Sequence, residues 1–305
     1  MGKALIAIDQ SGSYRVYLTI STDLVANAAE IHMTTPVATA ALGRTLTGAG
    51  LMGIMLKGED NKLTVSFKGE GPARQILATA YADGRVKGYI SNPEIDLPLK
   101  ANGKLDVGAA VGAGEMKVIK DLGMREPYIG SAPIISGEIA EDFTNYFYVS
   151  EQQKTSVALG VKIGRDAKVL CAGGMVIQML PDHQEEAVDA LEDMLRDMKP
   201  ITTLIEEEIL RSAGKSPEGV LESLLENIFG GMPEFYRPRV LEYRDIFWQC
   251  DCSEERLAQA LMTIGKKDLQ EIIDEDGHAE LVCQFCEKRY QFNKEQLLEI
   301  LERIK

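Results

Sequence analysis

Hydrophobic and polar residues along the first 180 positions mix strand-like and helix-like patterns. Val16, Leu18 and Ile20 fall on one face at a period of two, which is typical of a half-buried strand over residues 14–20. Turn residues separate this run from its neighbours and predict hairpins between them. The other segments expected to form strands are Ala4–Ile8, Leu63–Lys68, Ile76–Tyr81, Val86–Ile90, Met116–Lys120, Tyr128–Gly137, Ser156–Ile163 and Val169–Met179.

Three helices are expected among these strands. One begins at Thr22-Asp23, a second begins at Pro36, and a third spans Ala140–Glu151. Strands that follow one another through short turns, with a few helices between them, are typical of the α+β class. The pattern therefore predicts an α+β core domain over residues 1–180, with a largely antiparallel sheet.

Residues 181–230 change to a helical period. Their apolar residues recur three or four positions apart, Pro200 interrupts them, and Ser216-Pro217 restarts them as a helix cap and first helical residue. Helices this short are marginal alone, and the segment carries 13 acidic and 4 basic residues. We therefore expect a conditionally stable helical linker. Its apolar stripes are Ala187, Val188, Leu191, Met194, Leu195 and Met198, then Leu204, Ile205 and Ile209, then Val220, Leu221, Leu224, Leu225 and Ile228.

Residues 231–305 are expected to form a small terminal domain. A helix is expected to begin at Ser253 and to end at Gly265. Two strands follow, Ala279–Cys283 and Arg289–Phe292, and then a final helix capped by Asn293. A domain of this size cannot bury a large core, so it benefits from disulfides or a bound metal.

The acidic net charge of the chain argues against two classes of binding partner. The chain has a net charge of −14 and a pI near 4.8, and residues 232–305 hold 16 acidic and 11 basic residues. This argues against general binding to nucleic acid or to an anionic membrane. The most apolar stretch, residues 36–56, is interrupted by Arg44 and is typical of a buried, closely packed helix. With no secretory signal at the N-terminus, a cytoplasmic protein is expected.

Four of the five cysteines gather near the end of the chain. They form the pattern Cys-x-Cys, thirty intervening residues, then Cys-x-x-Cys. Four soft thiolates match the tetrahedral coordination of zinc, and a Cys-x-x-Cys turn commonly presents two of them. The odd cysteine total and the missing signal argue against a static disulfide framework. The sequence predicts one Zn²⁺ per chain, bound by Cys250, Cys252, Cys283 and Cys286.

The same spacings permit oxidation. The Cα atoms of residues i and i+2 lie at most about 7 Å apart, which is the limit of disulfide reach, and an i, i+3 pair in a turn also lies within reach. Each chelating pair is therefore able to close on itself, and oxidised sulfurs no longer bind zinc. Structural zinc contributes about 10–16 kcal/mol, which is comparable to or larger than the stability of a small domain. Oxidation is thus expected to unfold the terminal domain.

The remaining histidines and the fifth cysteine have simpler explanations. His278, five positions before Cys283, could serve as an extra ligand, but a surface turn histidine is expected because four cysteines are available. His32 and His183 have no partner pattern. Cys171 stands in an apolar strand, where we expect a buried, inert thiol.

One glycine pattern resembles a nucleotide-binding motif. Gly48-Ala-Gly50-Leu-Met-Gly53 matches G-x-G-x-x-G, but no clear strand precedes it. We expect these glycines to allow close backbone packing instead. No nucleophile motif and no carboxylate pair stands out among the residues.

The cysteine motif, at the end of an acidic 33.5 kDa chain, resembles that of the redox-regulated 33-kilodalton heat shock chaperones of bacteria. The resemblance covers the whole chain, in the same order of core, helical linker and zinc domain, with no departure at the four cysteines. The segments that carry it are Pro36-Val-Ala-Thr-Ala-Ala-Leu-Gly-Arg44, Ser91-Asn-Pro93, Gly103-Lys-Leu105, Ser136-Gly-Glu-Ile-Ala-Glu-Asp142, Tyr146, Ser150-Glu-Gln152 and Ala172-Gly-Gly174.

This resemblance implies an ATP-independent holdase and not an enzyme. In that family the reduced, zinc-bound form is inactive, and peroxide with heat, or hypochlorite, oxidises the cysteines. Carried over to this chain, the two disulfides are Cys250–Cys252 and Cys283–Cys286. The family then loses zinc, unfolds its terminal domain and linker, forms homodimers and binds unfolding client proteins through exposed apolar surface.

The linker stripes are our candidates for client contact. Met-rich and Leu-rich surfaces adapt to many partners, whereas before oxidation the same side chains are expected to pack inside the molecule. The candidate contacts are Leu191, Met194, Leu195, Met198, Leu221, Leu224 and Leu225.

Two other functions stay open from the residues alone. One is a zinc ribbon that binds nucleic acid through basic and aromatic side chains such as Lys288 and Tyr290, although its acidic net charge weighs against this. The other is an oxidoreductase that turns over thiols at Cys283 and Cys286.

Overall fold

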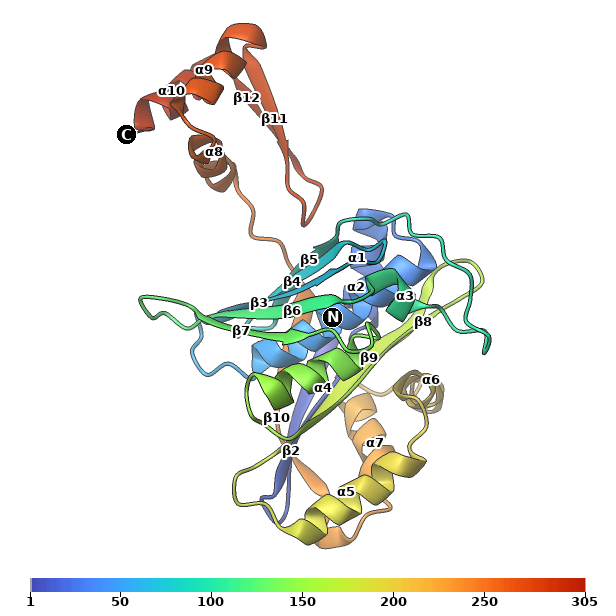
Figure 1. Cartoon of the computed structure of the whole chain (residues 1–305). Coiled ribbons are helices and arrows are strands. Elements are labelled where there is room, and N and C mark those ends of the chain that lie inside the picture. The colour runs from blue at the N-terminus through green and yellow to red at the C-terminus, as the bar shows by residue number, and fades with distance from the viewer. Residues whose placement is uncertain (1, 305) are drawn as a thin grey trace. The chain divides into compact units, whose positions relative to one another are not determined.

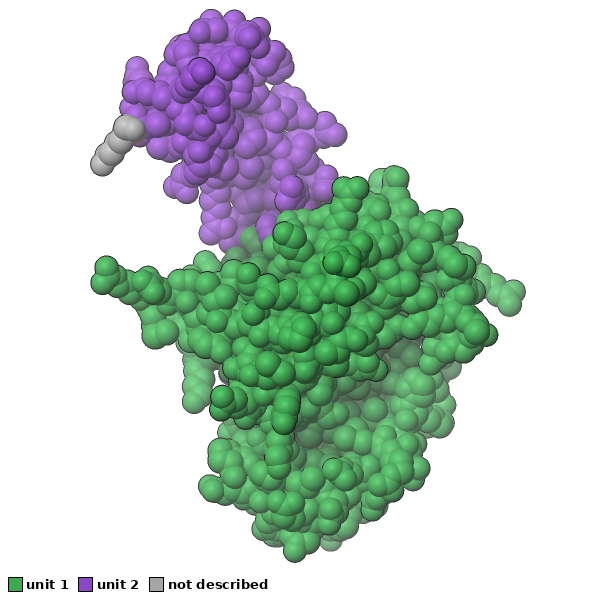
Figure 2. Space-filling view, viewed as in Figure 1, with its two compact units in different colours: residues 1–249 green, residues 250–305 purple. Residues whose placement is uncertain are grey.

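The computed structural model describes residues 2–304 and divides into two compact units, residues 1–249 and 250–305 (Figure 2). We call them the core unit and the terminal unit. Both mix helices with strands, which confirms the predicted α+β class. Among the described residues, no helix has both the length and the hydropathy that a membrane span requires.

A ten-stranded sheet runs through the core unit (Figure 1). Its strand order is β7-β6-β3-β4-β5-β10-β1-β2-β9-β8. Neighbours pair antiparallel except β5 and β10, where Phe247 lies opposite Arg85 in a short parallel pair. The strands are β1 (Gly2–Asp9), β2 (Tyr14–Ile20), β3 (Lys62–Gly69), β4 (Gln75–Tyr81), β5 (Arg85–Ile90), β6 (Gly114–Asp121), β7 (Tyr128–Pro133), β8 (Thr155–Ile163), β9 (Val169–Met179) and β10 (Pro238–Trp248).

Strand β10 places the boundary between the units later than expected. The terminal domain was expected to begin at residue 231, whereas β10 pairs along β1 within the core unit, which ends at residue 249. Only Ile246 of its eleven residues is buried. Charged side chains therefore mask the alternation by which a half-buried strand is recognised.

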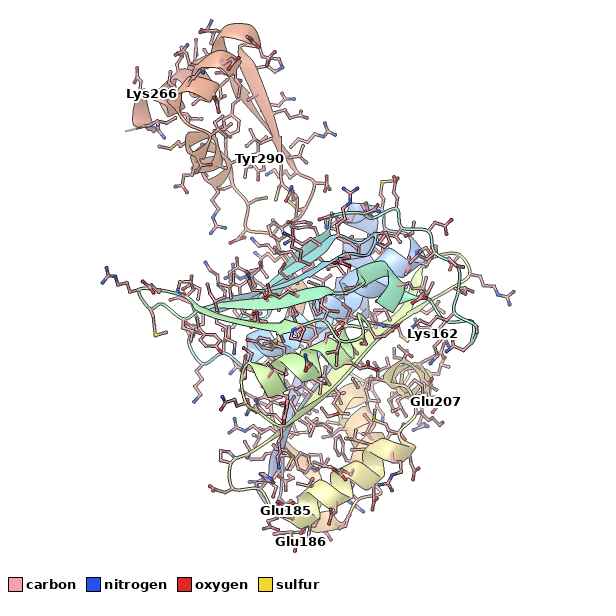
Figure 3. All side chains as sticks on the ribbon, viewed as in Figure 1. Lys162, Glu185, Glu186, Glu207, Lys266 and Tyr290 are labelled. Atoms are coloured by element: carbon pink, nitrogen blue, oxygen red, sulfur yellow. The ribbon has the colours of Figure 1, made fainter. Side chains whose placement is uncertain are left out.

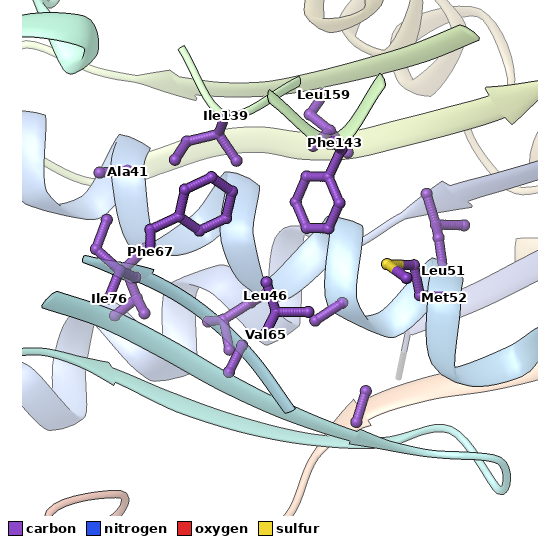
Figure 4. Close-up of a cluster of buried hydrophobic side chains, with 14 of the residues drawn as sticks. Ala41, Leu46, Leu51, Met52, Val65, Phe67, Ile76, Ile139, Phe143 and Leu159 are labelled. Carbon is purple, nitrogen blue, oxygen red and sulfur yellow. The ribbon is translucent and has the colours of Figure 1, made fainter. Parts of the chain in front are cut away.

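Helix α2 (Pro36–Ile54) lies at the centre of the core unit. All of its residues except Pro36 and Arg44 are buried, and it contacts strands of both halves of the sheet, β4 and β8 among them. Figure 4 shows Phe143 among the side chains packed here. A Cβ on Gly48 would lie 2.4 Å from Cε2 of that ring, so the glycine makes room for it. This is the close packing expected of the G-x-G-x-x-G segment. The other helices of the sheet region are α1 (Thr22–His32), α3 (Val107–Val111) and α4 (Ala140–Val149).

Alternate residues of β1 face two different cores. Ala4 and Ile6 belong to the cluster around α2, whereas Leu5 and Ala7 belong to a second cluster beneath the linker helices. Helices α6 and α7 pack on strands of the sheet, and α5 joins the second cluster through its side chains. The linker elements are α5 (Glu185–Asp197), α6 (Ile201–Arg211) and α7 (Pro217–Phe229), followed by the 3-10 turn η1 (Glu234–Tyr236).

The terminal unit combines a β-hairpin with three helices. Ser253 and Asn293 cap α8 and α10 as predicted, by accepting hydrogen bonds from the backbone N–H groups of Arg256 and Gln296. Helix α9 was not predicted. It begins directly after Gly265, whose φ of +97° breaks the chain direction between two helices rather than only ending one. The elements are α8 (Glu254–Thr263), α9 (Lys266–Glu275), β11 (His278–Val282), β12 (Arg289–Asn293) and α10 (Lys294–Arg303).

Candidate metal centre

The four clustered cysteines converge in the terminal unit. Cys250 and Cys252 lie in the segment before α8, and Cys283 and Cys286 lie in the turn between β11 and β12. Their four Sγ atoms all lie within 4.8 Å of one another. None of them is in a disulfide.

The sulfur spacing fits a tetrahedral metal ion. A Zn–S bond length of about 2.3 Å places the sulfurs of a regular tetrahedron about 3.8 Å apart. The Sγ atoms of Cys250 and Cys283 are separated by 3.7 Å, and those of Cys252 and Cys286 by 3.4 Å. The residues present therefore match a four-thiolate site without rearrangement.

Local hydrogen bonds hold the Cys-x-x-Cys turn. The carbonyl oxygen of Cys283 accepts from the backbone N–H groups of Cys286 and Glu287, and its own N–H donates to the carbonyl of Lys288. Glu287 adopts a φ of +58° to close the turn. This conformation directs both sulfurs to the same side of the hairpin.

The Cys-x-Cys segment is fixed to the first turn of α8. The guanidinium of Arg256 donates to the carbonyl oxygen of Asp251 at 2.9 Å and also binds its carboxylate. Because Asp251 stands between Cys250 and Cys252, this contact restrains both ligands. The N-terminal dipole of the following helix also favours negative charge at their sulfurs.

Tyr290 contacts one of the four cysteines, and this contact was not predicted from the sequence. Its hydroxyl donates a hydrogen bond to Sγ of Cys252 at 3.1 Å, and its side chain lies on β12 (Figure 3). The alternation of Tyr290 and Phe292 on the buried face of that strand was the available signal. A donor to a ligand sulfur is a typical outer contact of a metal site.

Electrostatics in the metal-free cluster favour one thiolate. Burial opposes ionisation of Cys252, but hydrogen bonds from Tyr290 and the neighbouring cysteines outweigh it and lower its pKa to about 7. Burial raises the pKa of Cys250, and it raises that of Cys286 to about 11. Like charges packed this closely cannot all form unless a cation offsets them, so the site suits a divalent ion.

The core that surrounds the cysteines is small. Phe292 and Leu269 are among its best buried side chains. A core of this size supplies little stability by itself. The complete set of buried residues is Leu261, Leu269, Ile273, Cys283, Tyr290, Phe292, Leu297 and Ile300.

The other candidate groups lie outside this cluster. His278 is exposed and contacts the carbonyl oxygen of Asp276 through Nδ1. Cys171 is buried in the core unit, where burial raises its pKa to about 11, as expected of an inert thiol. His32 and His183 each contact a backbone carbonyl in the core unit.

The seven candidate client contacts belong to the second cluster of the core unit. Leu221, Leu224 and Leu225 are at most 5% exposed, and Met194 is half-buried. Their packing inside the molecule is what we expected before activation. Contact with clients stays a prediction. The full set is Leu191, Met194, Leu195, Met198, Leu221, Leu224 and Leu225.

Comparison with known proteins identifies the family. A family model described as Hsp33 protein matches residues 3–293. The 33 kDa chaperonin of Clostridioides difficile is 46% identical over 299 residues, and 98% of each chain is covered. That of Bacillus cytotoxicus is 42% identical over 299 residues, with 97% of each covered.

A solved structure agrees over the same length. The crystal structure of a 33 kDa chaperonin (heat shock protein 33 homolog) from Thermotoga maritima matches with a TM-score of 0.84 and 33% identity, covering 98% of this chain and 97% of that one. The resemblance noted from the sequence motifs is therefore confirmed, and this chain belongs to the Hsp33 protein family of chaperones.

Proposed function

We propose that this chaperone is held inactive by one Zn²⁺ ion and switched on by oxidation of its four cysteines. The observation that carries the proposal is the set of four sulfurs at tetrahedral spacing inside a unit with a small core. The protein would act by binding unfolding proteins without catalysis and without ATP. Its free cysteines suit a reducing compartment such as the cytoplasm.

Bound zinc would supply folding free energy to the terminal unit, about 10–16 kcal/mol for a structural site. Cys250, Cys252, Cys283 and Cys286 would hold it as thiolates. Native domains are stable by only about 5–15 kcal/mol in total. We therefore infer that the terminal unit depends on the four sulfurs remaining reduced.

The oxidation itself needs one peroxide for each pair of cysteines. Two thiolates lose two electrons and form one S–S bond, while hydrogen peroxide takes up these electrons and two protons and becomes two waters. The joined sulfurs no longer hold the cation. The terminal unit then loses the interaction that offsets its conformational entropy.

Release of the linker would follow through β10. Helix α7 packs against β10, and the hydroxyl of Tyr243 on that strand donates to the carboxylate of Glu222 on the helix. Strand β10 ends at Trp248, two residues before Cys250. Unfolding after Cys250 would free this end of the strand, and the marginal linker helices would then expose their apolar stripes to clients. We also propose that the activated form is a homodimer.

Each part of the chain would have a separate role in this activation. Residues 1–180 would form the folded platform, residues 181–230 the conditional linker, and the zinc unit the sensor. We propose that the sensor proper starts at Cys250, because residues up to 249 belong to the core unit.

We propose Cys250–Cys252 and Cys283–Cys286 as the disulfides of the oxidised form. The sulfur distances do not select this pairing, because Cys250 also lies 3.7 Å from Cys283, and Cys252 lies 3.4 Å from Cys286. Closing the local pairs requires only a short loop to adjust once the metal is gone. Peptide mapping under non-reducing conditions should find the two local links; links from Cys250 to Cys283 would refute the pairing.

The proposed function is tested by titrating the reduced, zinc-loaded protein with hydrogen peroxide at elevated temperature. We expect zinc release, followed with a chromogenic chelator, to rise in parallel with suppression of aggregation of a thermally unfolding client. A Cys171→Ser variant is the matched control, because its thiol lies outside the cluster, and it should behave as the parent does. Zinc release without any gain in suppression would contradict the proposal.

A further inference from the structure

A groove opens between the linker helices of the core unit. It has a volume of about 660 Å³ and runs between α5, α6 and the segment that follows α7. Three of its lining residues are methionines, Met194, Met198 and Met232. Methionine side chains thus line the groove both from the first linker helix and its end and from the segment after the last linker helix.

These methionines also hold the linker in place. Met194 lies on α5, and Met198 directly follows the last residue of that helix. Both are half-buried and pack against the second cluster. Met232 is 4% exposed, and its sulfur lies 3.8 Å from the hydroxyl of Tyr14, which donates to the carbonyl oxygen of Tyr236. Each of the three side chains therefore lines the groove and also packs in or against the second cluster.

The groove is poorly suited to a new hydrogen-bond acceptor. Asp193 and Asp197 line it with carboxylates, which accept hydrogen bonds and do not donate them. Lys199 also lines it, but its ammonium already binds the carboxylate of Glu207 at 2.8 Å. The side-chain amide of Asn227 also lines the groove and can donate, so a sulfoxide oxygen would find few donors there and none among the apolar side chains of the second cluster.

We propose that Met194, Met198 and Met232 form a second oxidation sensor, at which hypochlorous acid or a peroxide converts thioethers to sulfoxides and loosens α5 independently of the cysteines. In the reaction with hypochlorous acid, the thioether sulfur loses two electrons and gains the oxygen atom, chlorine is reduced to chloride, and one proton is released. The polar product is disfavoured in apolar packing. The inference rests on the proposed function, since it concerns release of the same linker.

Thiol reductants separate the two sensors. Dithiothreitol reduces disulfides but not methionine sulfoxides, which require methionine sulfoxide reductases. The full-length protein is treated with hypochlorous acid, then with dithiothreitol and zinc to restore the cysteine site. Aggregation suppression and limited proteolysis within α5 are measured before and after this step, and peptide mass spectrometry locates the sulfoxides.

We expect the restored parent protein to keep part of its suppression and to be cleaved within α5 about tenfold faster than unoxidised protein, the factor expected when one buried polar group lacks a partner. Sulfoxide reductases should reverse both effects. The variant Met194→Leu, Met198→Leu and Met232→Leu conserves volume and should return fully to the unoxidised state. A Met33→Leu, Met124→Leu variant is the control, because these methionines are 84% and 62% exposed, and it should match the parent.

Two outcomes would overturn the inference. One is full return of the parent protein to the unoxidised state after dithiothreitol and zinc, even though sulfoxides are present at the three positions; the cysteine switch would stand. The other is equal residual cleavage in the parent and the triple leucine variant. If the triple variant is unstable, Met194→Leu and Met198→Leu made singly should each reduce the residual cleavage. Absence of suppression before reduction, with cleavage in α5 still raised, would instead count against the proposed chaperone switch alone.

Discussion

At the scale of single residues, Tyr290 connects the cysteine cluster to the core of the terminal unit. Its hydroxyl donates to Sγ of Cys252 at 3.1 Å, and its ring is buried beside Phe292 and Leu297 in the same cluster. A donor to a ligand sulfur stabilises the negative charge there and orients the ligand. We therefore expect Tyr290 to control how firmly the metal is held.

Removing that hydroxyl should weaken metal retention. Loss of an outer contact of this kind typically lowers metal affinity about 10–100-fold, so Tyr290→Phe should transfer zinc to a competing chelator at correspondingly lower chelator concentration. Tyr243→Phe is the control, because its hydroxyl contacts Glu222 in the core unit and no cysteine. Equal zinc transfer from Tyr290→Phe and the parent protein would show that the hydrogen bond has no part in metal binding.

The cluster of four cysteines could be predicted from sequence, whereas the contact from Tyr290 could not. Cys250, Cys252, Cys283 and Cys286 were recognisable because the spacing of a chelating pair is a local property of the chain. The contact from Tyr290 depends on the packing of two segments 38 positions apart. The sequence indicated that Tyr290 points inward only through the alternation of residues along a five-residue strand.

At the scale of elements, the linker helices depend on weak local contributions. Helix α7 begins at Ser216, whose hydroxyl accepts from the backbone N–H of Gly219 at 3.2 Å. A Cβ on Gly219 would meet no atom closer than 3.5 Å. The start of α7 is therefore a place where stability can be raised or lowered without disturbing the packing.

Two substitutions at this helix start should act in opposite directions. Gly219→Ala should stabilise the linker by about 0.4–1 kcal/mol, because alanine has less freedom to lose on folding, and Ser216→Ala should destabilise it by about 0.5–2 kcal/mol through loss of the cap. The temperature at which peroxide activates the chaperone should rise for the first and fall for the second. A shift of both variants in one direction would rule out linker stability as the control.

Glu138 forms ion pairs with two basic side chains that are distant in the sequence. Its carboxylate binds Arg44 of α2 at 2.8 Å and also binds Lys100. Burial by itself raises the pKa of Glu138, but these two cations outweigh it and hold the pKa below the ordinary value of 4.5. Because the folded pKa is lowered, the stabilisation is present above pH 4.5 and is lost as the pH falls through the folded value.

Glu138→Gln should therefore lower the melting temperature of the core unit at neutral pH. We expect a fall of about 2–4 °C, which corresponds to about 1 kcal/mol in a domain of this size, because a half-buried ion pair is partly screened. The difference from the parent should shrink in acid, where the parent carboxylate is also neutral. Calorimetry between pH 7 and pH 3 measures it, and a difference that does not change with pH would exclude this charge as the cause.

Helices and strands were predicted correctly where a single sequence pattern, such as a helical period or a capping residue, marked them. The stripes of α7 and the caps of α8 and α10 followed directly from periodicity and capping residues. Strand β10 was missed because its pairing with β1 and β5 depends on partners distant in sequence, while only one of its own residues is buried. Helix α9 was missed because Gly265 was interpreted only as a helix end.

At the scale of the whole molecule, two units with different sources of stability are joined by one short segment. The core unit has two extensive apolar clusters, whereas the terminal unit has one small cluster around the cysteines. Strand β10 belongs to the larger unit and leads directly into Cys250. This connection explains how a change at four sulfurs could reach helices that pack on the sheet.

We propose that oxidation of the cysteines unfolds the terminal unit and then releases the linker, while the sheet stays folded. Hydrogen exchange measured by mass spectrometry, on reduced zinc-loaded and on peroxide-oxidised protein, tests it most directly because protection reports local unfolding. We expect oxidation to remove protection from hydrogen exchange in residues 250–304 and in α5, α6 and α7, and to leave α2 protected. Loss confined to residues 250–304, with the linker helices as protected as before, would contradict it.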